Sequence, residues 1–166
     1  MKIAYTQTAG KGQLDAVLAD FAQRLTDRGL RTCGIVQINT DREDCRGCDM
    51  DVKILPDGPV FRISQDLGRN ARGCRLDSEA LELAVARVGK AMVAGSDVFI
   101  LNKFGKQEAA GRGFRDLIAQ AISLDIPVVT GVNGLNVEAL LEFTGGEGEA
   151  VEADLDILEE WLAEGS

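Results

Sequence analysis

The sequence predicts an α/β domain of three layers, in which helices flank a mostly parallel sheet that also contains one β-hairpin. The main observation is that short apolar, strand-like segments alternate with segments whose apolar residues recur at helical spacing. No internal repeat and no linker rich in proline or serine interrupts this alternation. A chain of 166 residues also buries roughly two-thirds of its unfolded surface on folding, enough for one core. Residues 1–166 are therefore expected to form a single domain.

The first half of the chain predicts two parallel strands and the hairpin. Residues 2–7 and 31–38 are short apolar strands, and the helix expected over 13–28 connects them. Because a helical crossover joins them, the two strands should be parallel. The segments 51–55 and 60–64 flank a Pro-Asp-Gly-Pro turn, and Asp-Gly between two β-rich segments is typical of a hairpin.

The second half continues the alternation. Asp77 or Ser78 can cap a helix, and the apolar segment 97–101 is typical of a strand buried on both faces. The remaining predicted elements are a helix around 114–122, a strand at 126–130, a short helix from Asn136 to about Phe143 and a last helix over 155–162. Three polar or glycine-rich segments are expected to be loops: 39–50, 65–75 and 102–113.

Composition excludes several functions. The formal net charge of −9 argues against nucleic acid and anionic membranes as partners. The absence of histidine excludes serine triads, Cys–His dyads and histidine-ligated metals. No apolar run approaches the ~20 residues of a membrane span, and no signal peptide is recognised. Four cysteines without an export signal suggest reduced thiols and a cytoplasmic location.

Basic residues collect in segments that the predicted topology brings toward the carboxyl ends of the strands. The segments 1–12, 69–75 and 103–115 together carry a charge of +8, which leaves −17 for the rest of the chain. Ligands of open α/β sheets bind at the carboxyl ends of the strands, and a basic rim concentrates anions there. A small anionic ligand is therefore expected, although the same side chains could instead satisfy helix ends and neighbouring acids.

The first of these segments resembles a phosphate-binding loop in part. Residues 5–12 read Tyr-Thr-Gln-Thr-Ala-Gly-Lys-Gly, so Gly10 and Lys11 lie between the first strand and the first helix. A full motif has an earlier glycine and a hydroxyl residue after the lysine, whereas here Tyr5 and Gly12 stand at these positions. An ordinary strand-to-helix turn explains the same residues.

A more specific resemblance comes from Asn-Lys-Phe-Gly-Lys at 102–106 and Gly-Cys-Arg-Leu-Asp at 73–77. With these motifs, nearly the whole chain resembles a bacterial family of unknown function. Its members are described as nucleoside-triphosphatase-like, and their genes often lie near molybdenum-uptake genes. More distantly, the chain is similar to small P-loop nucleoside-triphosphatases whose third strand ends in Asp-Glu-x-Gly-Lys-x-Glu. This resemblance implies a P-loop-like fold with a degenerate phosphate loop.

Mapped onto this chain, the motif places Asn102 and Lys103 where the active relatives carry an acid pair, while Gly105, Lys106 and Glu108 match. The resemblance implies that the acid pair holds Mg²⁺ and orients water. An amide ligates Mg²⁺ weakly and an ammonium group repels it. Lys103 could instead replace the positive charge of the metal, which would permit anion binding without hydrolysis.

The leading hypothesis is therefore a protein that binds a nucleotide, or a phosphate- or molybdate-like oxyanion, and hydrolyses it poorly or not at all. The candidate binding residues are Gly10, Lys11, Gly12, Asn102, Lys103, Lys106, Arg112 and Arg75. These cationic side chains are expected to converge on one pocket. One alternative is an active nucleoside-triphosphatase in which Glu108 or Asp77 replaces the missing acid, and the other is a ligand-free protein-interaction module with an unknown partner.

A metal site is not expected. Cys45 and Cys48 form a single CxxC pair, Cys74 lies in the arginine-rich segment, and Cys33 is expected to be a small core residue. Zinc needs four ligands, and zinc ribbons pair two CxxC units. If the chain did bind a metal, Cys45, Cys48 and Cys74 would be the candidates.

Overall fold

The computed structural model describes residues 2–8, 13–41, 48–63 and 77–164. The strands are β1 (Ile3–Thr6), β2 (Thr32–Asp41), β3 (Cys48–Ile54), β4 (Val60–Arg62), β5 (Val98–Phe104), β6 (Val128–Val132) and β7 (Glu149–Ala150). The helices are α1 (Gln13–Asp27), α2 (Ser78–Val93), α3 (Lys106–Ala109), α4 (Arg115–Ser123), α5 (Val137–Phe143) and α6 (Leu155–Ala163). The predicted α/β domain with a mostly parallel sheet is confirmed.

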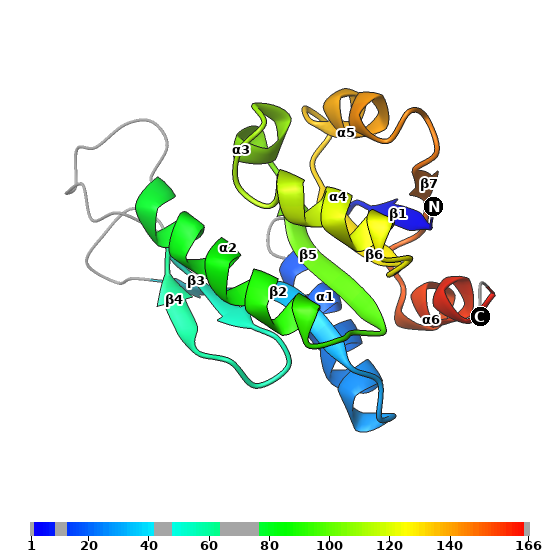
Figure 1. Ribbon diagram of the computed structural model, residues 1–166, viewed down its shortest axis with the longest axis horizontal. Coiled ribbons are helices and arrows are strands. Elements are labelled where there is room, and N and C mark those ends of the chain that lie inside the picture. Colours follow the sequence, from blue (N-terminus) through cyan, green and yellow to red (C-terminus); the bar gives the residue numbers. More distant parts are fainter. Residues whose placement is uncertain (1, 9–12, 42–47, 64–76, 165–166) are drawn as a thin grey trace.

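The seven strands form one sheet in the order β4-β3-β2-β5-β6-β1-β7. Parallel pairing joins β2, β5, β6, β1 and β7, while β3 and β4 pair antiparallel at one edge as the predicted hairpin. The carboxyl ends of β1, β2, β5 and β6 therefore meet at the same edge of the sheet. In Figure 1, α3 and α5 lie above that edge.

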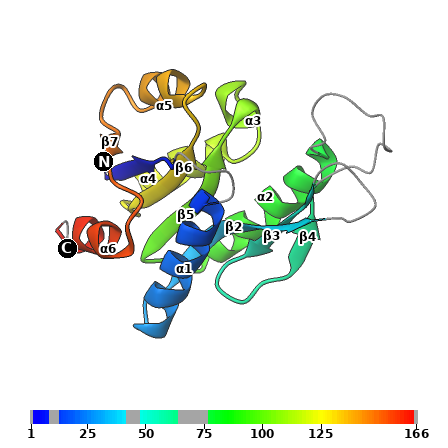
Figure 2. The same cartoon turned by 180° about the vertical axis from the view of Figure 1, so that it is seen from behind.

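Helices cover both faces of the sheet, as the three-layer prediction requires. One layer of core residues lies under α2 and α4 and includes Cys33, Leu101 and Phe114. The other lies under α1 and α6 and includes Phe21, Ile100 and Trp161. Figures 1 and 2 show α2 and α4 on one side of the sheet and α1 on the other. No helix in the described ranges is long and apolar enough to cross a membrane.

Three local predictions were wrong. The expected loop at 39–50 is partly strand, because β2 and β3 continue their antiparallel ladder through the pairs 39–50, 40–49 and 41–48. The expected loop at 102–113 begins as strand, since β5 runs on to Phe104, and it contains the short helix α3. The two-residue strand β7, which pairs with β1, was not predicted. In each case pairing or packing with a neighbouring segment overrides the local polar composition.

Candidate functional site

The end of β5 is held to its neighbours by a buried amide. Asn102 is only 2% exposed. Its Oδ1 accepts a hydrogen bond from the backbone N–H of Gln37 on β2 (2.9 Å), and its Nδ2 donates to Asp15 Oδ1 on α1 (2.6 Å). Asn102 therefore ties β5 to both elements and fixes the position of the Asp15 carboxylate.

Asp15 lies beside the candidate site, and the sequence analysis did not single it out. It lies in the first turn of α1, four positions after Lys11, and is half-buried. The motif comparison places Asn102 where the relatives of the resemblance carry an acid, and in the structure the Asp15 carboxylate lies opposite this amide. The one available signal was its position four residues after Lys11 in the sequence, near the start of a predicted helix.

Glu108 organises the segment between β5 and α4. Its carboxylate is 4% exposed and accepts backbone hydrogen bonds from Gly105 (2.8 Å) and Phe114 (3.1 Å). Burial raises the pKa of this carboxyl above its ordinary value, although the hydrogen bonds from the two N–H groups act in the opposite direction. Both carboxylate oxygens are thus engaged in holding the backbone of this segment.

A cavity of about 410 Å³ opens at the carboxyl edge of the sheet. Asn102, Lys103, Lys106 and Glu108, four of the predicted site residues, line it. Both lysine residues are exposed, and within the described part of the chain neither forms an ion pair. The cavity lining therefore includes two exposed cations that no described acid pairs with, in a protein whose net charge is −9.

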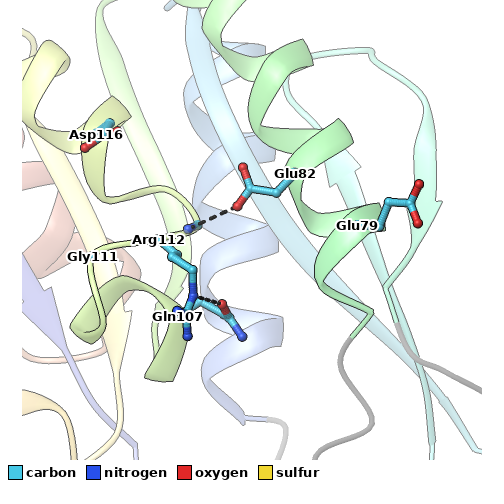
Figure 3. Close-up of a pocket in the computed structure, with 7 residues that line it drawn as sticks. Glu79, Glu82, Gln107, Gly111, Arg112 and Asp116 are labelled. Carbon is cyan, nitrogen blue, oxygen red and sulfur yellow. Dashed lines mark hydrogen bonds between the residues drawn. The ribbon is translucent and has the colours of Figure 1, made fainter.

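Arg112 lines a different cavity from the two lysines. Its Nε donates to Gln107 Oε1 (3.0 Å), and the surrounding side chains include three acids, Glu79, Glu82 and Asp116 (Figure 3). Glu82 in turn accepts the backbone N–H of Gly113 (3.3 Å). The expectation that Lys11, Lys103 and Arg112 converge on one pocket is not supported for Arg112, and Lys11 lies outside the described residues.

Asp77 has the position that the sequence predicted for a helix cap. Its Oδ1 accepts the backbone N–H groups of Glu79 and Ala80, both at 3.1 Å, at the start of α2. The proposed substitute acids Glu108 and Asp77 are therefore both engaged with backbone N–H groups. The predicted residues Gly10, Gly12 and Arg75 lie outside the described residues.

Two other basic residues of the predicted rim contact aromatic rings. Lys2 precedes β1, so it lies at the amino end of the sheet, with its Nζ 4.7 Å from the centre of the Trp161 ring. The Arg115 guanidinium lies 4.8 Å from the centre of the Phe143 ring. The basic rim is thus smaller than the charge count indicated, because segment charge does not specify where a long side chain reaches.

Of the cysteines, Cys33 is the predicted core residue. It is fully buried, its Sγ lies 3.6 Å from the carbonyl oxygen of Val98, and burial raises the pKa of its thiol. Cys45 and Cys74 lie outside the described residues, and Cys48 begins β3. Among the side chains that the structure describes, no three histidine, cysteine or acidic residues cluster as metal ligands would.

The donors at the end of β5 also do not fit Mg²⁺. This cation prefers several oxygen ligands in octahedral geometry. The Asn102 oxygen already accepts the Gln37 N–H, and the next residue offers an ammonium group. No step through a metal is therefore derived for this position.

The fold is that of small P-loop nucleoside-triphosphatases. THEP1 from the hyperthermophile Aquifex aeolicus superposes with a TM-score of 0.64 at 20% identity, over 100% of this chain and 97% of that one. A human cancer-related nucleoside triphosphatase superposes with a TM-score of 0.62 at 16% identity, over 99% and 95%. At these identities the likeness shows the fold alone.

The chain belongs to the family described as "Protein of unknown function (DUF2478)", whose model matches residues 3–161. It is also 43% identical over 150 residues to a protein of Bradyrhizobium diazoefficiens named molybdenum import ATP-binding protein ModC 2. The match covers 89% of this chain but only 16% of that relative. Most of the relative therefore lies outside the shared region.

Proposed function

We propose that this domain binds a nucleotide or another oxyanion at the carboxyl edge of its sheet and hydrolyses it poorly or not at all. The observation that carries the proposal is the pair Lys103 and Lys106, which lie at the mouth of one cavity and form no ion pair within the described ranges. Unpaired cations at this edge attract phosphate-like ligands. The Gly10–Gly12 turn would supply backbone N–H groups to the same anion, as in P-loop proteins.

Weak hydrolysis is proposed from the residues at the end of β5. Where the active relatives of the resemblance carry two acids, this chain has Asn102 and Lys103. Lys103 can neutralise an anion, but it offers no carboxylate oxygen with which to orient water. A link to molybdenum is proposed from the name of the relative, which makes molybdate a reasonable oxyanion to test beside phosphate.

Thermal unfolding with ATP, GTP, molybdate and phosphate, each with and without Mg²⁺, tests this function. A ligand present at about 100 times its Kd stabilises the folded chain by roughly 2.7 kcal/mol. We expect at least one of these anions to raise Tm without Mg²⁺, and Lys103→Glu to remove the effect. Lys90→Glu is the matched control, because this exposed lysine in the last turn of α2 lies far from the cavity. If no anion changed Tm, a ligand-free interaction module would be the better description.

One observation favours a second candidate, an active nucleoside-triphosphatase. The Asp15 carboxylate lies beside the end of β5, held there by Asn102, and a positioned carboxylate can act as a general base toward water. In this candidate Asp15→Asn would lower ATP hydrolysis at least about a hundredfold while nucleotide binding, measured by calorimetry, stayed unchanged. Absence of turnover in the unmodified chain would exclude it.

A further inference from the structure

The cavity extends from the lysines onto the face of the sheet opposite α1. Its floor is formed by side chains of the core layer under α2 and α4, all under 9% exposed: Ile35, Val52, Ile63, Leu81 and Phe114. Helix α1 packs on the other face. Within the described residues, β1 and α1 contribute nothing to the cavity lining. The apolar part of the cavity is therefore a compartment on this face of the sheet, next to Asn102.

Two amides provide a hydrogen-bonding edge at the wall of this compartment. Asn136 Nδ2 donates to Asn133 Oδ1 (2.9 Å), and both residues line the cavity. This bond leaves Asn133 with an N–H donor and Asn136 with a carbonyl acceptor, neither used by another described residue. A neighbouring donor and acceptor complement a cyclic amide, in which a ring C=O lies next to a ring N–H.

The charges of the lining select an anionic substituent. Lys103 and Lys106 have no acidic partner among the described residues, and Glu108 is the one acid in the described lining. Its oxygens already accept the N–H groups of Gly105 and Phe114. An apolar floor, one hydrogen-bonding edge and two cations thus meet in one cavity of about 410 Å³, within the roughly 300–1,000 Å³ typical of small-molecule sites.

We propose that the ligand of this cavity is a flat nitrogen heterocycle with a cyclic-amide edge and a phosphate substituent. The ring would pack against Leu81 and Phe114, its amide edge would bond to Asn133 and Asn136, and its phosphate would face the lysines. In its phosphate contacts this inference rests on the proposed function, because the phosphate would be held by the same two lysines. The ring contacts are independent of it.

Calorimetry with the full chain tests the proposal, using GMP, AMP, guanosine and ribose 5-phosphate as probes. Guanine has a cyclic-amide edge, whereas adenine does not. We expect GMP to bind about tenfold more tightly than AMP and than ribose 5-phosphate, which is 1.4 kcal/mol for each comparison. If GMP bound no more tightly than ribose 5-phosphate, the proposed ring site would be contradicted, whereas the anion site would still be supported.

Variants of α2 provide the matched pair. Leu81→Trp should fill the ring compartment and weaken GMP binding at least about tenfold without changing the affinity for ribose 5-phosphate. Leu83→Trp, on the exposed side of the same helix, should change neither. If Leu81→Trp unfolds, Asn133→Ala serves instead and should remove the preference for GMP over AMP. Unchanged GMP affinity in the substituted chain would contradict the proposal.

The probes also separate this proposal from the proposed function. Binding of guanosine without binding of any phosphate, abolished by Leu81→Trp, would contradict the anion site and support the ring site. Equal affinities for ribose 5-phosphate and GMP would support the anion site and contradict the ring site. If none of the four probes bound, both proposals would be wrong.

Discussion

At the residue scale, the hydrogen bond between Asn102 and Asp15 explains why an amide suits the end of β5. The two side-chain atoms are 2.6 Å apart, and a second carboxylate at this distance would oppose the first. An amide also satisfies the Gln37 N–H on its other side. The position that the resemblance assigns to an acid is therefore occupied by a residue that pairs with an acid from α1.

Exchanging the two residues tests this pairing. We expect Asn102→Asp to lower the free energy of unfolding by about 2 kcal/mol, because it places two carboxylates together in a half-buried site. The double variant Asp15→Asn with Asn102→Asp rebuilds the pair in reverse and should recover most of that loss. Urea unfolding of the three chains measures both values. A double variant no more stable than Asn102→Asp would show that the pair is not what holds β5 to α1.

The raised pKa of Glu108 predicts how stability depends on pH. Between the ordinary carboxyl value of 4.5 and the higher folded-state pKa, the folded chain keeps a proton that the unfolded chain has released. The contribution of Glu108 to the free energy of unfolding is therefore fully present below the ordinary value and declines as the pH rises toward the folded-state pKa. The stability difference between the unmodified chain and Glu108→Gln should shrink over that window.

Urea unfolding at a series of pH values from about 4 to 7 measures this difference. Glu142→Gln, at an exposed position on α5, is the matched control. A Glu108 contribution that grew with pH would mean that its hydrogen bonds from Gly105 and Phe114 outweigh burial.

At the element scale, Gly113 allows Glu108 to close the segment between β5 and α4. Its φ of +63° lies in the left-handed region, and a Cβ at this position would collide with Glu108 Oε2. We expect Gly113→Ala to cost about 2 kcal/mol or more, since backbone strain and collision add. Gly134→Ala is the control, because its Cβ would meet no atom within 4 Å. Equal thermal stability of the two variants would contradict this role for Gly113.

Some elements of the fold can be predicted from the sequence and others cannot. The helices α1, α2 and α4 and the hairpin follow from local periodicity and turn chemistry. The continuation of β5 through Asn102 and Lys103 does not, because those polar residues become strand only through pairing such as Phe104 with Val132 of β6. Likewise, the four residues of α3 depend on Glu108, whose partners lie on both sides of the helix.

The sequence likewise predicts only some residues of the candidate site. Lys103 and Lys106 could be predicted as candidates because a motif places them at the carboxyl end of a buried strand, where ligands of parallel sheets bind. Arg112 could not be separated from them by sequence, since only the structure shows that it bonds to Gln107 and lines a different cavity. Asp15 could not be predicted, because only its tertiary contact with Asn102 brings it beside the site.

At the scale of the whole molecule, a net charge of −9 opposes the approach of an anion, while the two lysines attract it locally. These effects differ in range. Salt at about 0.15 M screens exposed charges beyond roughly 8 Å, so most of the repulsion is screened, whereas a phosphate in contact with an ammonium group is screened less. The local attraction should therefore decide binding at physiological ionic strength.

Charge reversal at two positions separates the local effect from the global one. Lys103→Glu and Lys90→Glu change the net charge equally, but only the first lies at the cavity. We expect Lys103→Glu to weaken phosphate or ATP binding at least about tenfold at 0.15 M salt, and Lys90→Glu to change it less than about twofold. At about 0.01 M salt, where the screening length is roughly 30 Å, the Lys90→Glu effect should increase, because the distant charge is then no longer screened from the ligand. Equal losses of affinity for the two variants at both salt concentrations would mean that the anion responds to the overall field of the protein and not to a site at the carboxyl edge of the sheet.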